Sequence, residues 1–338
     1  MSEVQTIIVG EDDSEIRLDR WFKRHFPALG HGPLEKLLRT GQIRIDGKRA
    51  KSGTRLAAGQ SVRVPPLPDS SQMPPRRVEV AEADLEALRA SILYQDDWVI
   101  AIDKPAGLAV QGGTGQSRHL DAMLDGLRFD RPQRPKLVHR LDKDTSGVLL
   151  LARSDRAARV LAAAFREQDT RKFYWAIVPG VPRKRRGRID LPLAKHVDGG
   201  DEKVVGDTLA GKSAVTLYAT AGVRRKKAAW LVLRPLTGRT HQLRVHCAAF
   251  GYPILGDGKY GGRAAFPSGL PPVQRLHLHA REIAVPHPKD GTTLRITAPL
   301  PADLATTWRA LGFDPAGGED AAARLEHGDA LARVDVAS

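Results

Sequence analysis

The spacing of apolar side chains predicts a small, partly helical domain at the N-terminus. The stretch IRLDRWFKRHF places apolar residues on one helical stripe, at Ile16, Leu18, Trp21, Phe22 and Phe26. The stretch GPLEKLLRTGQIRIDGKRA then predicts a second short helix that ends at Gly41, a strand, and a turn at Asp46 and Gly47. Because QSVRVP alternates as a closing strand, residues 1–64 are expected to form one domain, which also includes an N-terminal strand.

Short apolar runs separated by glycine and proline dominate residues 91–312. Strand patterns occur in WVIAIDKPAGLAV, KFYWAIVPG, SAVTLYATAG, AAWLVLRPLTG, LRVHCAAF and TTLRITAPL, whereas RAARVLAAAFREQ has the apolar face of a helix. Because the strands outnumber the helices and do not alternate regularly with them, we expect an α+β fold with a mixed, largely antiparallel sheet and flanking helices.

Composition predicts a linker and a tail. The stretch PPLPDSSQMPPRR is rich in proline and polar residues, so residues 65–90 are expected to be an extended linker in which EADLEALRASI adds one short helix. Residues 313–338 contain 2 arginines against 6 acidic residues, with glycine and alanine throughout. This composition predicts a frayed, disordered acidic tail with at most a marginal helix.

The overall charge narrows the class of partner. The 338 residues include 53 Lys and Arg against 39 Asp and Glu, a formal net charge of +14, which favours nucleic acid or an anionic membrane surface. No apolar run approaches the roughly 20 residues that a membrane-spanning helix needs. The N-terminus lacks a signal-peptide pattern and Cys247 is the one cysteine. We therefore expect a cytoplasmic location, no membrane partner, and neither a disulfide framework nor a Cys-rich zinc site.

Positive charge is concentrated in the N-terminal domain. Residues 15–64 contain 12 Lys or Arg and 4 Asp or Glu, a local net charge of +8. These cations lie on both predicted helices and on the hairpin, which suits a phosphate-facing surface, although an ordinary solvated helix pair has the same pattern. The segment resembles the small RNA-binding domain first seen in small-subunit ribosomal protein S-four, through RLDR, LL, G, IRI and GK at residues 17–20, 37–38, 41, 43–45 and 47–48. The resemblance implies RNA contacts by Arg17, Arg20, Arg44 and Lys48.

Ionisable residues gather immediately before a predicted strand. The stretch LVHRLDKDTSGVLLLA puts His139, Arg140, Asp142 and Asp144 ahead of the apolar run at 148–152. This is either a charged turn or an active-site loop that the strand holds in place. Two further stretches carry polar residues: KFYWAIV, with Lys172 and Tyr174, and LTGRTHQLRVH, at a turn-to-helix or turn-to-strand junction, with Arg239, His241, Gln242, Arg244 and His246.

Four motifs resemble the RluA family of ribosomal large-subunit pseudouridine synthases. They are DKPAGLAV, HRLDKDTSG, GRTHQLRVH and GYPILGDGKYG, and the resemblance covers about residues 94–311. The N-terminal domain and QGG at 111–113 favour the RluC- and RluD-like branch, although many relatives have histidine in place of Gln111. The resemblance implies the pseudouridine synthase fold, with a central cleft, and isomerisation of uridine in 23S rRNA or in an assembling large subunit. The chemistry neither oxidises nor hydrolyses anything, so no cofactor is expected.

The resemblance also implies roles for four residues. Asp142 matches the catalytic aspartate, and Arg244 matches the arginine that forms an ion pair with it. Arg140 matches the arginine that fills the space of the flipped base, and Tyr174 matches the tyrosine that packs against the target uracil and is a candidate for accepting its C5 proton. Asp144 is the competing carboxylate, but it is better interpreted as a turn residue. Without the flanking motifs, Tyr174 would be interpreted as a core aromatic.

Other clusters and functions have weaker support. The spacing of His241, His246, His277 and His279 does not predict a metal site, and GGTG at 112–115 lacks the Lys-Ser/Thr of a phosphate-binding loop. A non-catalytic RNA-binding protein and a carboxylate-dependent hydrolase stay as alternatives to the isomerase. The hydrolase would need a second catalytic carboxylate at a suitable spacing. We expect a monomer.

Overall fold

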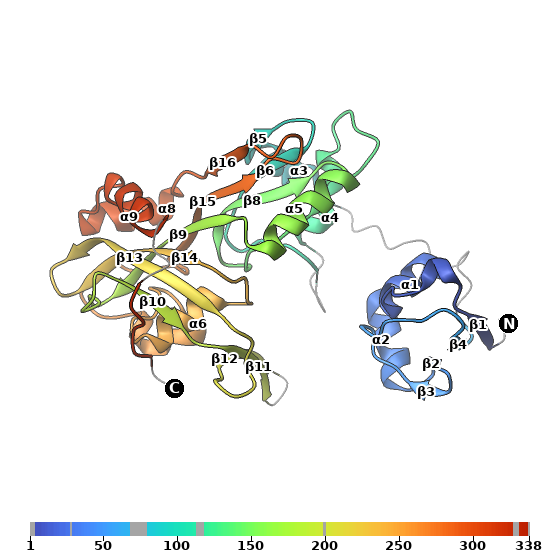
Figure 1. Ribbon diagram of the computed structural model, residues 1–338. Coiled ribbons are helices and arrows are strands. Elements are labelled where there is room, and N and C mark those ends of the chain that lie inside the picture. The colour runs from blue at the N-terminus through green and yellow to red at the C-terminus, as the bar shows by residue number, and fades with distance from the viewer. Residues whose placement is uncertain are drawn as a thin grey trace. The chain divides into compact units, whose positions relative to one another are not determined.

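The computed structural model describes residues 4–27, 29–67, 80–112, 118–198, 201–326 and 331–336. The chain divides into two compact units, Met1–Glu79 and Val80–Ser338, which are drawn in Figure 1. Within the described residues, no helix is both long enough and apolar enough to cross a bilayer. The prediction about GGTG lies mostly outside the described residues, because only Gly112 of that stretch is described.

The first unit has two helices and a small sheet. Helices α1 (Leu18–His25) and α2 (His31–Arg39) accompany a four-stranded sheet in the order β1-β4-β2-β3, formed by Gln5–Ile8, Ser61–Val64, Arg44–Ile45 and Lys48–Arg49. Side chains of the predicted helical stripe fill its core, since Leu18, Trp21 and Phe22 are fully buried. Asp46 and Gly47 both have positive φ, as a two-residue hairpin turn of type I′ requires. The helices and strands predicted for this segment are confirmed.

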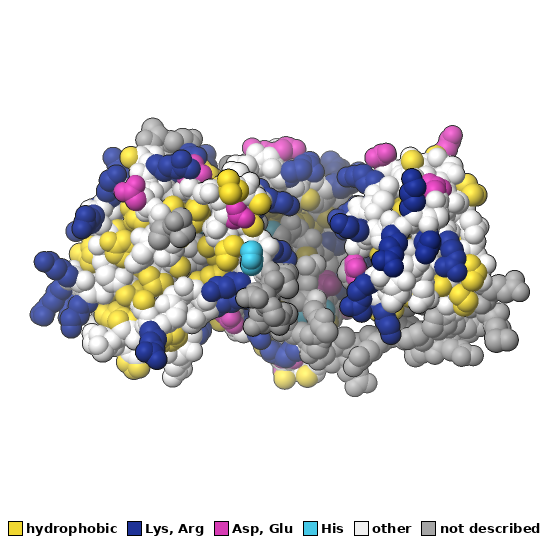
Figure 2. Space-filling view, turned by 90° about the horizontal axis from the view of Figure 1, so that it is seen from below, with side chains coloured by type: hydrophobic (Ala, Val, Ile, Leu, Met, Phe, Trp, Pro, Cys, Tyr) yellow, Lys and Arg dark blue, Asp and Glu magenta, His cyan; other side chains and the backbone are white. Residues whose placement is uncertain are grey.

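Exposed cations surround this small core. Arg17, Arg20, Arg44 and Lys48 are all exposed, and Lys and Arg side chains are spread over the face of the first unit that Figure 2 shows. Two of them are held in place: Arg17 forms an ion pair with Asp19 at 2.6 Å, and Arg44 donates to the backbone carbonyls of Gly41 and Gly47.

The second unit is organised around a ten-stranded sheet. Its main path runs β10-β13-β14-β9-β15-β8-β6-β5, while β16 pairs with β15 and β7 pairs with β8. The strands are β5 (Ile92–Gln95), β6 (Val99–Lys104), β7 (Lys136–Leu137), β8 (Ser146–Ala152), β9 (Arg171–Pro179), β10 (Arg186–Asp190), β13 (Val215–Arg224), β14 (Ala228–Pro235), β15 (Leu278–Pro286) and β16 (Thr293–Thr297). Every pair is antiparallel except β15 with β8. The predicted mixed, largely antiparallel sheet is confirmed.

Helices cover both faces of this sheet, as Figure 1 shows. They are α3 (Glu82–Ala90), α4 (Leu120–Met123), α5 (Asp155–Glu167), α6 (Gln242–Ala249), α7 (Gly258–Gly261), α8 (Ala302–Leu311) and α9 (Ala316–Glu326), and β11 (Leu193–Asp198) and β12 (Asp201–Gly206) form a separate hairpin. Alternate residues of β14 face opposite cores: Trp230 packs with α8 and α9, whereas Leu231 packs with α6. Likewise, α3 and α4 cover one face of β6 and β8, and α5 covers the other.

Three sequence predictions differ from the structure. LRVHCAAF is not a strand but lies in helix α6, six of whose residues are buried, so its apolar pattern has no clear period. The segment after Phe313 is not wholly a frayed tail: α9 buries Ala321 and Leu325 in the core. This packing depends on small residues, because a Cβ on Gly318 would lie 2.5 Å from Trp175 and Trp230. Helix α3 belongs to the second unit rather than to a linker, because Leu88 is buried in its core.

Candidate active site

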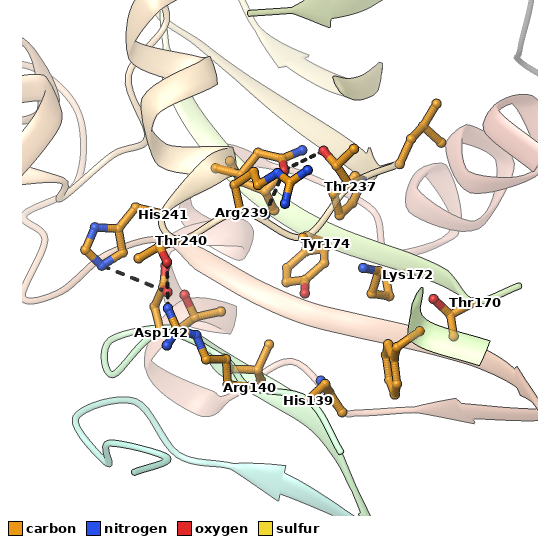
Figure 3. Close-up of a pocket in the computed structure, with 18 of the residues that line it drawn as sticks. His139, Arg140, Asp142, Thr170, Lys172, Tyr174, Thr237, Arg239, Thr240 and His241 are labelled. Carbon is orange, nitrogen blue, oxygen red and sulfur yellow. Dashed lines mark hydrogen bonds and ion pairs between the residues drawn. The ribbon is translucent and has the colours of Figure 1, made fainter. Parts of the chain in front are cut away.

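A cavity of about 510 Å³ opens at the centre of the second unit. Its walls come from the loop at 139–145, the end of α5, the start of β9, and the turn at 235–241 that leads into α6 (Figure 3). Three segments that are far apart in the sequence, namely those containing Asp142, Tyr174 and His241, therefore meet in one place. The grouping of these stretches that the motifs implied is thus present in the structure.

A buried lysine on the neighbouring strand β6 supports the backbone of the loop that carries Asp142. The ammonium of Lys104 on β6 is fully buried and donates hydrogen bonds to the carbonyls of Lys143, Pro105 and Leu108, at 2.8 to 3.0 Å. Burial lowers the pKa of Lys104 to about 8, although Asp144 and Asp142 act in the opposite direction. Sequence reasoning missed this residue, which lies in the quoted motif DKPAG without an assigned role.

A tight turn completes the loop. The backbone N–H of Thr145 donates to the Asp142 carbonyl at 3.2 Å, which leaves Asp144 exposed in the middle of the turn and outside the cavity wall. The interpretation of Asp144 as a turn residue agrees with this position. Gly147 has φ of +115°, and a Cβ there would lie 2.2 Å from the Ala280 carbonyl oxygen, so only glycine allows β15 to approach so closely.

His139 shapes the wall rather than supplying a charge. Its Nε2 accepts a hydrogen bond from the Leu150 N–H at 2.8 Å, and its ring stacks on Phe165 with 4.5 Å between centroids. Burial, helped by the charge of Lys172, lowers the pKa of His139 to about 3. The imidazole is therefore neutral at physiological pH.

The opposite wall is a turn that Gln242 holds together. Its side-chain oxygen accepts from the Thr237 hydroxyl at 2.7 Å and from the Arg239 N–H at 3.1 Å, while its amide nitrogen donates to β13 at Val215 and Thr216. The sequence singled out Gln242, but it did not indicate this organising role.

The two walls are joined across the cavity. The Arg140 guanidinium donates to the Thr240 hydroxyl at 2.6 Å, an interaction drawn in Figure 3. Next to it, Nε2 of His241 lies 3.9 Å from Oδ1 of Asp142, and Nδ1 of His241 is 2.6 Å from the Tyr260 hydroxyl. Burial lowers the pKa of His241, whereas the charge of Asp142 raises it. His241, which the sequence assigned no catalytic role, is thus the titratable group beside Asp142.

Arg244 differs from its sequence prediction. It was expected to form an ion pair with Asp142, but its guanidinium instead holds both carboxylate oxygens of Asp257, each at 2.8 Å, and lies 5.0 Å from the Tyr260 ring centroid. Burial would lower the pKa of Arg244, but the hydrogen-bonded Asp257 carboxylate, together with the charges of Asp142 and Tyr260, raises it. Asp257 is itself buried, so it needs this cation more than the partly exposed Asp142 does. Asp257 and Tyr260 lie in the motif GYPILGDGKYG, but no role was predicted for either.

Tyr174 and Lys172 line the floor of the cavity. They are two residues apart on β9 and therefore face the same side of the sheet. Burial raises the pKa of Tyr174, and the charge of Asp142 raises it further, so the phenol is neutral. In this state Tyr174 offers a ring surface and a hydroxyl donor, but it is a poor proton acceptor.

The other histidines are hydrogen-bonded in the core. His246 contacts the Thr216 hydroxyl and the Leu191 carbonyl, His277 contacts the Thr307 hydroxyl, and His279 contacts the Ser146 hydroxyl. Across the described residues, no three His, Cys, Asp or Glu side chains are arranged to hold a metal ion.

Comparison with known proteins identifies the family. The model for the RNA pseudouridylate synthase family matches residues 98–249, which contain both the Asp142 loop and α6. Ribosomal large subunit pseudouridine synthase C from Salmonella typhimurium (strain LT2) is 35% identical over 308 residues, which cover 88% of this chain and 93% of the relative. The chain belongs to the RluA family of pseudouridine synthases. Membership makes it an RNA pseudouridine synthase, an enzyme that isomerises uridine in RNA.

Relatives also occur outside bacteria. RNA pseudouridine synthase 4, mitochondrial, from Arabidopsis thaliana is 33% identical, with 92% of this chain and 82% of the relative covered. The solved structure of human RNA Pseudouridylate Synthase Domain Containing 4 has 29% identity and a TM-score of 0.56, and the match covers 69% of this chain and 97% of that one. The predicted pseudouridine synthase fold is therefore confirmed.

Proposed function

We propose that this RluA-family enzyme converts specific uridines of 23S rRNA to pseudouridine, on free rRNA or on an assembling large subunit. The name of the Salmonella typhimurium relative refers to the large ribosomal subunit, and the net charge of +14 suits a polyanionic substrate. The enzyme acts in the cytoplasm as a monomer, without a cofactor and without membrane binding. In this proposal the exposed cations of the first unit, including Arg17, Arg20, Arg44 and Lys48, bind phosphates of the RNA.

The observation that carries the proposal is the position of Asp142. It is the one carboxylate among the described residues that line the cavity. Isomerisation breaks the bond between C1′ of the ribose and N1 of uracil, and forms a bond from C1′ to C5, while the C5 proton is lost and N1 gains one. A single carboxylate can serve this reaction as a nucleophile toward the sugar or base, or as a base toward the ribose.

Arg140 and Tyr174 are placed to handle the flipped nucleotide. Arg140 is exposed at the cavity and bound to the Thr240 hydroxyl, from which its planar guanidinium can move into the space that the base leaves. Flipping costs a few kcal/mol, which stacking of this group partly offsets. Tyr174 offers its ring to the uracil, and its raised pKa favours this packing role over proton abstraction in the free enzyme.

Arg244 acts on Asp142 without touching it. Because its charge is paired with Asp257, its main role in this proposal is to hold Tyr260, and through Tyr260 the ring of His241, beside Asp142. Arg244 is thus a positioning residue. This assignment replaces the direct ion pair that the resemblance implied.

The alternatives lack a structural counterpart. A carboxylate-dependent glycoside hydrolase would need a second acidic group across the cavity, and the described lining contains Asp142 alone. A non-catalytic RNA-binding protein would not require a neutral tyrosine and a supported aspartate in one pocket.

The test is to map pseudouridine in rRNA from cells with the gene, without it, and complemented with Asp142→Asn. We expect defined 23S rRNA sites to lose pseudouridine on deletion, and the Asn variant not to restore them. An unchanged map would contradict the proposal, and losses confined to another RNA would refute the assigned substrate.

A further inference from the structure

The cavity extends well beyond Asp142. In Figure 3, Asp142 and His241 lie at one end, Tyr174 lies in the middle, and Lys172, Thr170 and His139 lie at the other end. Together with Phe165 and Gln168, which also line the cavity, these last three residues form what we call the Lys172 subsite. None of its five residues has a role in the isomerisation described above.

Lys172 is the unusual member of this subsite. Among the residues that the structure describes, none accepts a hydrogen bond from its ammonium or forms an ion pair with it, and burial is the one influence that lowers its pKa. Lys104, which is fully buried near the cavity, is instead bonded to three carbonyls. Lys172 is partly buried and lines the cavity, so its ammonium faces the cavity without a partner among the described residues, and an anionic ligand entering the cavity would supply one.

The charge of the surroundings indicates an anion. The described lining contains Arg140, Arg166, Lys172 and Arg239, but only one carboxylate, Asp142, which lies at the opposite end. The neutral His139 does not compete with the ammonium for an anion. Since Lys172 is two residues from Tyr174, the two lie about 7 Å apart along the strand. That spacing suits a group next to the nucleotide that occupies the Tyr174 position.

We propose that the Lys172 subsite binds a phosphodiester group adjacent to the target uridine, on the same RNA strand. The inference rests on the proposed function, because it requires the target nucleotide to lie between Asp142 and Tyr174. The subsite would then fix the direction in which the strand crosses the cavity. Lys172 is accordingly a binding residue whose loss weakens RNA affinity.

The experiment combines single uncharged linkages with protein variants. Three RNA fragments are made, each with a single methylphosphonate at a different one of the three linkages nearest the target uridine. The affinity of each fragment is measured for the wild type, Lys172→Met and Lys172→Arg. For the wild type, we expect one of the three replacements to weaken binding by about 10-fold or more, as is typical of a hydrogen bond to a charged group. The same replacement should change the affinity of Lys172→Met by less than about 2-fold, and Lys172→Arg should keep most of the effect.

Controls separate this inference from the proposed function. Lys184→Met removes an exposed lysine outside the cavity and should respond to the linkages as the wild type does. Lys172→Met removes an unpaired charge from a partly buried position, so its thermal unfolding should show a folded protein. The inference would be overturned if all three methylphosphonates changed the affinities of the wild type and of Lys172→Met equally. It would also be overturned if the effect of Lys172→Met depended only on replacing the target uridine by 4-thiouridine, because Lys172 would then contact the base and not a phosphodiester. Failure of the wild type to form pseudouridine in the unmodified fragment would instead contradict the proposed function, while the linkage comparison stays readable.

Discussion

The two units of the chain use positive charge in opposite ways. The first unit spreads exposed cations around a small core, with a net charge of +8 over residues 15–64. Around the cavity of the second unit, cations have distinct environments: Lys104 lies buried behind the Asp142 loop and bonds to its backbone, and Arg140 bridges two walls. Charge on a surface supplies affinity that salt can screen, whereas charge in a partly buried site depends on geometry. Changes in the first unit should therefore act on binding, whereas changes in the second, apart from those in the Lys172 subsite, should act on rate or folding.

The substitution Asp142→Asn should give the clearest separation of rate from binding. The variant keeps the size of the side chain and removes the charge that nucleophilic attack needs, so the single-turnover rate should fall on the order of 10⁴-fold or more, while RNA affinity stays within a few fold. Tritium release from labelled rRNA fragments measures the rate. Asp144→Asn is the matched control, because Asp144 is exposed outside the cavity, and it should cost far less. If Asp142→Asn kept its turnover, Asp142 would not be the catalytic carboxylate.

Arg244→Met should act on folding as well as on rate. It leaves the Asp257 carboxylate buried without a partner, which is expected to lower the free energy of unfolding by about 3–5 kcal/mol. Urea unfolding measures this loss. Arg244→Lys should lose less, because a point cation still reaches the carboxylate although it cannot bind both oxygens. If the double variant with Asp257→Leu is no more stable than Arg244→Met, the pair is not the source of the effect.

Removing residues 1–79 should act on affinity alone. The first unit contains no proposed catalytic residue, so we expect binding about 10- to 100-fold weaker near physiological salt, and a flatter dependence of affinity on salt concentration. Single-turnover rates at saturating RNA should be nearly unchanged. A collapse of those rates would mean that the first unit takes part in the active site.

Acid should destabilise the second unit before the first. Burial lowers the pKa values of His246 and His279 to about 4, so their folded forms stay neutral while the unfolded chain takes up protons below about pH 6.5. Stability that is complete above pH 6.5 is thus lost as the pH falls toward 4, on the order of 3 kcal/mol for each group. In the first unit, burial would raise the pKa of Asp13, but contacts with His25 and Arg24 lower it, so its contribution is lost only below about pH 4.

Hydrogen exchange resolved by unit measures this difference between pH 7 and pH 4. His246→Gln, which cannot titrate, should flatten the profile of the second unit. A profile with the same slope in the variant would show that His246 is not responsible.

The sequence predicted helices and strands better than it predicted which side chains contact one another. Runs such as KFYWAIVPG and RAARVLAAAFREQ carry their own period, and both form the predicted elements. Helix α6 was mistaken for a strand because most of its residues are buried. The packing of α9 depends on Trp175 and Trp230, which are distant in sequence from Gly318. Similarly, only the fold determines that Arg244 meets Asp257 and that His241 lies beside Asp142, since ion-pair partners leave no periodic pattern in the chain.

The buried ammonium of Lys104 makes the shape of the Asp142 loop sensitive to alkali. An ammonium donates three hydrogen bonds and a neutral amine only two, so above about pH 8 one of the three carbonyls that it holds would lose its donor. The fall in activity at high pH would then reflect a change in the conformation of the Asp142 loop and not the titration of a reacting group. Assigning that high-pH limit to a catalytic base would mistake the titration of a structural lysine for a step of the reaction.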